Sequence, residues 1–252
     1  MRAALVTGST SGLGFSTARK LFEAGFAVSL HGKSAWEQLP AEFQAWVNSS
    51  PLLEYLSADL SDSAAPDALV QGAAAHWGQL DCLVSNAAIT LHAESSEVLP
   101  AQWERVFHVN VQAPFFLAQA ALPHLALRSG SIVFVSSTNA HRVNKKNLAY
   151  DASKAALNHM AKGVALEARS QAVRVNVVMP GGIDTPMLQR WLVDYAGSED
   201  AAQAALAQAK EDGVVGAADD IADSIVFLAS DSARWVTGAS LIVDGGAYLE
   251  EG

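Results

Sequence analysis

Short apolar segments alternate with longer segments of helical periodicity along the whole sequence, and this alternation limits the possible folds. The apolar segments are continuously hydrophobic, which is typical of strands buried on both faces of a parallel sheet. We expect strands at residues 3–6, 26–30, 52–55, 82–84, 132–135, 173–178 and 241–243. We expect helices at residues 14–24, 64–77, 101–127, 149–169 and 218–228. This order predicts an α/β fold with an open, doubly wound parallel sheet.

Composition excludes several classes of function. Half of the 252 residues are hydrophobic, so the chain can bury a core and is not disordered. The net charge of −10 argues against nucleic acid and anionic membranes as partners, because both attract a surface rich in Lys and Arg. The single cysteine, Cys82, excludes an internal disulfide and a cysteine-based zinc cluster, and we expect no metal.

Targeting and membrane signals are not visible in the sequence. No secretory signal follows Met1, and polar residues interrupt the most apolar segment, 111–127. That segment is also shorter than the ~20 apolar residues of a membrane-spanning helix. We therefore expect a cytoplasmic protein.

No linker, repeat or low-complexity tract divides the sequence, so we expect one domain of residues 1–252. Residues 183–215 have no place in the predicted sheet but carry apolar residues at helical spacing. They could form a lid over a site, or an amphipathic helix pair that packs on the core. Periodicity alone favours the helix pair.

A glycine-rich segment, Thr-Gly-Ser-Thr-Ser-Gly-Leu-Gly at residues 7–14, lies between the first strand and the first helix. Glycines permit a sharp turn and a close approach of the backbone to a pyrophosphate, and the helix N-terminus offers free N–H groups to it. The spacing is G-x-x-x-G-x-G rather than the commoner G-x-G-x-x-G. A tight turn without a ligand is the alternative, but the position favours a dinucleotide site.

The end of the second strand bears on the choice of dinucleotide. NAD-binding sites place a carboxylate there to accept hydrogen bonds from the adenosine ribose. Residues 30–34 read Leu-His-Gly-Lys-Ser and contain no carboxylate. Lys33 could neutralise a 2′-phosphate, which favours NADP, although a solvated loop charge explains Lys33 nearly as well.

Tyr150 and Lys154 are four residues apart at the start of an expected helix, so both side chains share one face. A free tyrosine has a pKa of about 10. An ammonium ~4 Å away at an effective dielectric of ~20 contributes ~4 kcal/mol, or about three pKa units. We therefore expect Lys154 to lower the pKa of Tyr150 into a range useful for acid–base catalysis. The pair alone is common by chance, and an exposed helical pair is the simpler interpretation of it.

Further motifs follow in order after the glycine segment: Ser-Asn-Ala-Ala at 85–88, Asn110 in a long helix, Val-Ser-Ser at 135–137, Tyr150 with Lys154, and Met-Pro-Gly-Gly-Ile-Asp-Thr at 179–185. Together they closely resemble the short-chain dehydrogenase/reductase family, in its compact single-domain branch, over residues 5–246. The resemblance implies a Rossmann-like, three-layer α/β/α domain with about seven parallel strands. It makes residues 183–215 the substrate-binding lid.

The resemblance also implies an activity, which is hydride transfer between NAD(P)(H) and a secondary alcohol or ketone. Tyr150 would be the general acid or base, and Lys154 would lower its pKa and hold the nicotinamide ribose. Ser137 would polarise the substrate oxygen, whereas Ser136 would be structural. Asn110 would kink its helix and hold a water that connects Lys154 to solvent.

The cofactor would be held along the carboxyl edge of the sheet, with Asp59 at the adenine and Thr185 at the nicotinamide carboxamide. Ala88 replaces the usual glycine, and Ser11 stands where many NADP-preferring members carry a basic residue, so NADP(H) is only slightly favoured over NAD(H). The implied cofactor-binding residues are Gly8, Ser11, Gly12, Leu13, Gly14, Gly32, Lys33, Asp59, Leu60, Asn86, Ala87, Tyr150, Lys154, Pro180, Gly181, Ile183 and Thr185.

The substrate pocket would take residues from three segments, and we expect contacts from Thr90, Asn139, His141, Arg142, Met187 and Trp191. The basic run 141–146 could steer an anionic substrate or be a solvated loop. A 3-oxoacyl-thioester reductase of the same family and a non-catalytic nucleotide-binding or sensing protein are the alternatives. Relatives form dimers or tetramers through the long helices and the last strand, so we expect a homo-oligomer.

Overall fold

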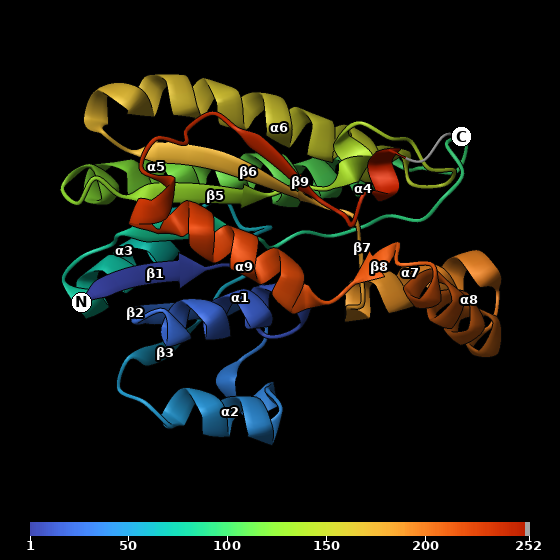
Figure 1. Cartoon of the computed structure of the whole chain (residues 1–252), viewed down its shortest axis with the longest axis horizontal. Helices are drawn as coiled ribbons and strands as arrows, with labels where there is room; N and C mark the ends of the chain where they lie inside the picture. The colour runs from blue at the N-terminus through green and yellow to red at the C-terminus, as the bar shows by residue number, and fades with distance from the viewer. Residues whose placement is uncertain (250–252) are drawn as a thin grey trace.

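A seven-stranded, entirely parallel sheet forms the centre of the computed structural model, which describes residues 1–249 (Figure 1). Its strands are β1 (Arg2–Val6), β2 (Phe26–Gly32), β3 (Leu53–Ser57), β4 (Cys82–Ser85), β5 (Ser131–Val135), β6 (Arg174–Pro180) and β9 (Ser240–Val243). The spatial order is β3-β2-β1-β4-β5-β6-β9, which confirms the doubly wound sheet predicted from sequence. The order reverses between β1 and β4, and ligands bind beyond the carboxyl ends of the strands at such a reversal.

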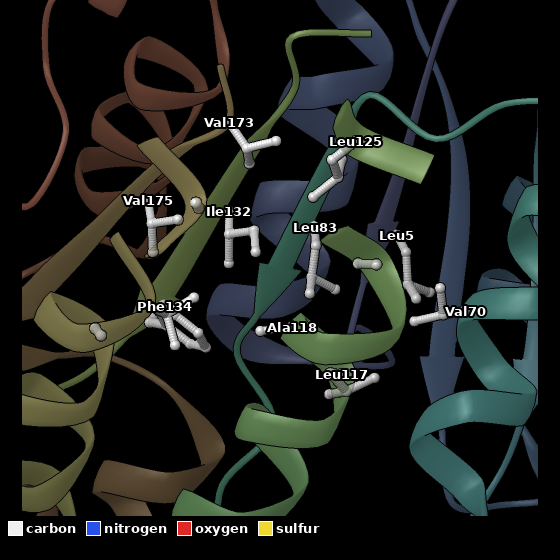
Figure 2. Packing of buried hydrophobic residues seen from close by; sticks show 14 of the residues in the cluster. Leu5, Val70, Leu83, Leu117, Ala118, Leu125, Ile132, Phe134, Val173 and Val175 are labelled. Carbon is white, nitrogen blue, oxygen red and sulfur yellow. The ribbon is translucent and has the colours of Figure 1, made fainter. Parts of the chain in front are cut away.

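Helices cover both faces of the sheet. They are α1 (Gly12–Glu23), α2 (Ala41–Asn48), α3 (Ala65–Trp77), α4 (Pro100–Phe107), α5 (Ala113–Ala126), α6 (Leu148–Ala168), α7 (Pro186–Ala196), α8 (Glu199–Glu211) and α9 (Ala218–Ala229). On one face, α3, α5 and α6 bury Val70, Leu117 and Leu157 against the strands. Figure 2 shows part of this layer, with Val70 of α3 beside Leu5 of β1. On the other face, α1 and α9 pack together over the strands.

The long helix expected at residues 101–127 is interrupted. Helix α4 is followed by a π-helical turn, His108–Gln112, before α5 begins. Asn110 lies within this turn and is 1% exposed. Single π-helical turns inside helices are frequent at functional sites.

Residues 183–215 form the predicted helix pair, α7 and α8, but the pair does not join the core. None of the residues of α7 is buried, and α7 and α8 pack mainly against each other. A second, two-stranded sheet of β7 (Gly182–Ile183) and β8 (Val215–Gly216) connects the pair to the body, beside which it projects in Figure 1. An ion pair of 2.5 Å between Asp184 and Lys210 lies at the same end of the helix pair. Within residues 1–249, no helix has both the length and the hydropathy that a membrane span requires.

Candidate active site

A cavity of about 490 Å³ lies at the carboxyl edge of the sheet, a volume that suits a small organic ligand. It extends from the glycine segment after β1 to helix α7. Its lining includes every residue predicted to contact the cofactor, together with Ser137, Thr90, Asn139, Met187 and Trp191. Of the predicted site residues, the lining lacks Asn110, His141 and Arg142.

The glycine segment has the geometry of a diphosphate cradle. Gly8 and Gly12 adopt positive φ angles of 64° and 55°, which other residues rarely adopt. A Cβ atom on Gly14 would lie 2.2 Å from the carbonyl oxygen of Gly8, so the helix can begin this close only with glycine there. Ser11 precedes α1 without capping it through its side chain. The N–H groups of the first turn therefore remain available to an anionic ligand.

His31 supports this segment from the end of β2, a role that no sequence motif indicated. Its Nδ1 accepts a hydrogen bond of 3.2 Å from the backbone N–H of Gly8. Its Nε2 lies 3.1 Å from the carbonyl oxygen of Ala58, to which it donates in this tautomer. Burial lowers the pKa of His31, so the ring is neutral and can make both contacts.

Lys33 and Asp59, which both line the cavity, form an ion pair of 2.6 Å beyond the ends of β2 and β3. The hydrogen bond from Lys33 holds the pKa of Asp59 well below its usual range. Both side chains are well exposed, at 66% and 40%. A bound phosphate would therefore have to share the Lys33 ammonium with the carboxylate of Asp59.

Asn86 ties the glycine segment to β4. Its Nδ2 donates to the carbonyl oxygens of Thr7 at 2.9 Å and Gly8 at 3.1 Å. The Thr7 hydroxyl in turn accepts from the backbone N–H groups of Asn86 and Ala87. Ala88 lines the cavity without a positive φ, so its methyl group is accommodated without backbone strain.

Tyr150 and Lys154 lie in the first two turns of α6, as predicted, but their electrostatics differ from the prediction. Lys154 is 2% exposed, and its Nζ donates to the carbonyl oxygen of Val135 at 2.9 Å. Burial lowers the pKa of Lys154 to about 7 and raises that of Tyr150 to about 12. A hydrogen bond with Ser137 acts in the opposite direction on Tyr150.

The expected lowering of the Tyr150 pKa by Lys154 is therefore wrong for the protein without ligand. The ammonium lies 5.5 Å from the centre of the Tyr150 ring rather than at the ~4 Å assumed from spacing. Desolvation also penalises both charged forms, and a lysine with a pKa near neutrality carries only part of a charge.

Asn110 acts from behind the cavity wall. Its Oδ1 accepts from the N–H of Ile89, and its Nδ2 donates to the carbonyl oxygen of Ile89, each at 2.9 Å. The same Nδ2 donates to the Ser153 hydroxyl at 3.0 Å, and that hydroxyl donates to the carbonyl oxygen of Tyr150. Asn110 thus connects Ile89, which lines the cavity, to the turn that carries Tyr150 and Lys154.

The far end of the cavity is built from the start of α7. Thr185 caps this helix, and its hydroxyl accepts from the N–H of Leu188 at 3.4 Å. Met187 and Trp191 follow on the helix, and the Trp191 ring stacks on Tyr195 with centroids 5.2 Å apart. The first part of the 183–215 segment therefore forms a wall of the cavity.

Two basic side chains after β5, His141 and Arg142, contact the C-terminal turn and do not line the cavity. Arg142 donates to the carbonyl oxygen of Ala247, and its guanidinium lies 5.1 Å from the centre of the Tyr248 ring. The His141 ring packs edge-on against Tyr248. The exposed cations at this end of the cavity lining are Arg105 of α4 and Arg190 of α7, which no motif singled out.

Comparison with known proteins agrees with this geometry. A family model described as enoyl-(acyl carrier protein) reductase matches residues 8–248. The chain is 33% identical over 248 residues to 2-(R)-hydroxypropyl-CoM dehydrogenase from Xanthobacter autotrophicus, with 97% of each chain covered. The chain belongs to the short-chain dehydrogenase/reductase family.

Two more members show the breadth of this family. The chain is 31% identical over 249 residues to 3-oxoacyl-(acyl-carrier-protein) reductase from Staphylococcus aureus, with 98% of each chain covered. The crystal structure of levodione reductase matches 99% of this chain and 98% of its own, with a TM-score of 0.89 and 27% identity. Like other short-chain dehydrogenases/reductases, this chain is an NAD(P)-dependent oxidoreductase that acts on CH–OH groups and the corresponding carbonyls.

Proposed function

We propose that this enzyme interconverts a secondary alcohol and a ketone with Tyr150 as general acid and base. The observation that supports this most directly is the enclosure of Tyr150, Ser137 and Lys154 in the same cavity as the glycine segment. A hydroxyl pair beside a buried amine, opposite a diphosphate cradle, provides a proton donor next to a cofactor site.

Each group then has a part in the reaction. Ser137 donates a hydrogen bond to the substrate oxygen, and Tyr150 transfers the proton to it during reduction. Lys154 holds a proton behind Tyr150 and binds the ribose hydroxyls, while Asn110 positions the turn that carries both. When bound, the nicotinamide supplies or accepts the hydride. Thr185 orients its carboxamide, and Met187 and Trp191 exclude water from the reacting atoms.

A spectrophotometric assay tests the proposed function. The protein is mixed with NADPH or NADH and a panel of cyclic and acyclic ketones that includes a 3-oxoacyl thioester. We expect loss of the reduced cofactor with at least one simple ketone. Turnover of the thioester alone would instead identify a 3-oxoacyl reductase. Cofactor binding without turnover of any substrate would contradict the proposal and favour a nucleotide-sensing protein.

We also propose that NADP(H) is preferred over NAD(H). The support is Lys33, which follows β2 directly, together with the absence of a carboxylate at residues 32–34. The substitution Lys33→Ala should lower kcat/KM for NADPH by about tenfold, the value of one charge-assisted hydrogen bond, and leave NADH little affected. An equal effect on the two cofactors, measured with the same ketone, would contradict this assignment.

A second copy of the chain is the partner that we propose for two apolar surfaces. One lies on α4 and α5, where Phe115 and Phe116 are 39% and 37% exposed beside Trp103 and Phe107. The other lies around β9, where Leu241 and Ile242 are each 37% exposed. Two separate self-complementary surfaces would build a tetramer, and one a dimer. The cytoplasmic location stays a prediction.

A further inference from the structure

The cavity carries an excess of basic side chains although the chain as a whole is acidic. The sequence has 26 Asp and Glu residues against 16 Lys and Arg. Among residues 1–249, the lining nevertheless holds one carboxylate, that of Asp59, against four basic groups: Lys33, Arg105, Lys154 and Arg190. Lys33 is paired with Asp59, and Lys154 donates to a backbone carbonyl oxygen. The uncommitted positive charge of the cavity is therefore that of the two arginines.

No carboxylate of residues 1–249 neutralises Arg105 or Arg190. Both side chains are exposed, and neither guanidinium takes part in an ion pair. Asp184, just before α7, is paired with a lysine of α8 instead. Glu104 and Asp194, on the same helices as the arginines, lie outside the cavity lining. An anionic ligand in the cavity would thus meet two guanidinium groups that have no competing partner.

Arg105 enters the cavity from the side of α6. It lies one turn before Val109, which also lines the cavity. The π-helical turn that contains Val109 also holds Asn110, which donates to the Ser153 hydroxyl of α6. Helix α4 packs against α6 as well. Arg105 therefore belongs to the wall that is joined to the helix of Tyr150.

Arg190 enters the cavity from α7. It lies one turn after Met187, and both residues line the cavity. The neighbouring Trp191 ring packs edge-on against His92, with ring centroids 6.4 Å apart. His92 belongs to the segment between β4 and α4. The α7 wall thus contacts the segment that leads into α4, so Arg105 and Arg190 border the same part of the cavity.

The chemistry of arginine selects the ligand group. A guanidinium keeps its charge at any ordinary pH, and its planar set of N–H donors matches a carboxylate or a phosphate. Two such groups at one part of a cavity attract an anion and disfavour a cation. The proposed mechanism assigns the diphosphate of the cofactor to the glycine segment and its 2′-phosphate to Lys33. The substrate is then the ligand that remains for Arg105 and Arg190.

We propose that Arg105 and Arg190 are specificity-determining residues that bind an anionic oxygen group of the substrate, a carboxylate or a phosphate. The substrates are then oxo acids or phosphorylated ketones in reduction, and the corresponding alcohols in oxidation. The anion site lies on two helices rather than on the basic run 141–146, in which His141 and Arg142 contact the C-terminal turn. The inference rests on the proposed function, because it assumes that the ligand beside Tyr150 is a ketone or an alcohol.

Matched charged and neutral ketones test the inference on the wild-type enzyme. Oxidation of NADPH is measured with 4-oxopentanoate, 5-oxohexanoate and 6-oxoheptanoate, each against its methyl ester, and with hydroxyacetone phosphate against hydroxyacetone. We expect kcat/KM to be at least about tenfold higher for the anion in at least one pair, because a charge-assisted hydrogen bond is lost with the neutral ketone. Equal values or a preference for the neutral ketone in every pair would overturn the inference while leaving the proposed function in place.

Salt separates attraction by charge from a preference for shape. Exposed charges are screened by ions, so the ratio of the two kcat/KM values in the preferred pair should fall several-fold between about 50 and 500 mM NaCl. The ratio cancels any effect of salt on cofactor binding, because both ketones are measured with the same cofactor. A ratio that stayed constant with salt would overturn the inference.

Variants locate the preference. In the double variant Arg105→Gln with Arg190→Gln, the ratio should fall to about one, mainly through a higher KM for the anion. Replacing both arginines by lysine should restore part of the ratio, because the charge is kept but the planar donor set is lost. Arg169→Gln makes the same chemical change at an exposed position directly after α6, outside the lining, and should keep the wild-type ratio. An unchanged ratio in the double variant would overturn the inference.

Binding provides a readout that does not depend on turnover. Calorimetric titration of the NADP⁺-bound protein with 5-oxohexanoate and with hydroxyacetone phosphate should show at least one anion whose Kd is about tenfold or more weaker in the double glutamine variant than in the wild type. No detectable binding of either anion to the wild type, or an unchanged Kd in the variant, would contradict the inference. Binding that depends on the two arginines, without reduction of any ketone, would instead contradict only the proposed function.

Discussion

Lys154 is a cation enclosed at the carboxyl end of β5, and its enclosure is the most consequential feature at the scale of single residues. Its Nζ has a backbone carbonyl as partner rather than a carboxylate. Removing the ammonium from water without a counter-charge is unfavourable, which is why its pKa falls to about 7. This cost should be visible in the stability of the free protein.

The pH dependence of unfolding measures that cost. Between pH 7 and 10.5 the unfolded chain keeps a proton on Lys154 that the folded chain has released. The free energy of unfolding contributed by Lys154 should therefore rise with pH, by up to about 1.4 kcal/mol per unit. Denaturant unfolding of the cofactor-free wild type and of Lys154→Met isolates this contribution as a difference.

The pKa of Tyr150 is raised from its ordinary value of 10 to about 12. Above pH 10 the unfolded chain therefore releases the Tyr150 proton first, and this residue's contribution to the free energy of unfolding falls as pH rises. For this reason the comparison of Lys154→Met is made below pH 10. If the difference in unfolding free energy between the wild type and Lys154→Met stayed constant from pH 7 to pH 10, Lys154 would not be desolvated in the folded protein.

Sequence patterns indicated the candidate catalytic residues but not the groups that surround them. Tyr150, Lys154 and Ser137 follow a motif order, so they were placed correctly in one cavity. His31 belongs to no motif, because its position depends on burial and on partners that are distant in the chain. Arg105 and Arg190 enter the lining from two helices, a proximity that spacing does not encode.

At the scale of elements, the turn from β1 into α1 carries the cofactor prediction. Its conformation depends on the absence of a side chain at Gly14, which faces Gly8 and Asn86. Other glycines lie in helices without such contact, and they provide matched controls.

The substitution Gly14→Ala should disrupt the turn. The added methyl group would lie 2.2 Å from the Gly8 carbonyl oxygen and 2.5 Å from Nδ2 of Asn86, so the helix or the loop must move. We expect a loss of about 1–3 kcal/mol in stability and at least about tenfold weaker cofactor binding. Thermal unfolding and fluorescence titration with NADPH measure the two effects.

Gly72→Ala is the control, because the added methyl group would meet only Leu56 side-chain carbons at 3.8 Å or more. Alanine is the better helix former, so this variant should gain up to about 1 kcal/mol without a change in cofactor affinity. If the two substitutions had equal effects, the turn would not depend on the absence of a side chain at Gly14.

The elements that escaped prediction are short or depend on tertiary contacts. Helix α2 follows a proline and was not expected from its mixed sequence, although Phe43 and Val47 are buried against the α1 layer. Strands β7 and β8 contain two residues each, too few for a periodic pattern. The π-helical turn at Asn110 was expected only as a kink implied by family resemblance.

At the scale of the whole molecule, the reversal of strand order next to β1 places the glycine segment and α6 at one edge of the sheet. The alternation of apolar segments predicted this sheet, because buried parallel strands leave a strong signal. Assembly with other copies leaves a weaker signal, since exposed and buried apolar residues look alike in a sequence.

The oligomer can be tested at the α4–α5 surface. The double substitution Phe115→Glu with Phe116→Glu places charge on two exposed rings that are 5.2 Å apart. We expect the mass from light scattering to fall to half of the wild-type value or less. Leu127→Glu, at an 83% exposed position directly after α5, should keep the wild-type mass. A wild-type protein that is already monomeric would contradict the proposed assembly.

The substitution Tyr150→Phe tests the central claim most directly, because it removes one hydroxyl and keeps the ring. With NADPH and a ketone that the wild type reduces, kcat/KM should fall by about a thousandfold, the usual size of a general-acid contribution. The Kd for NADPH, measured by fluorescence titration, should stay within about threefold of the wild-type value. If Tyr150→Phe reduced the ketone at the wild-type rate, Tyr150 would not be the proton donor and the mechanism would be wrong.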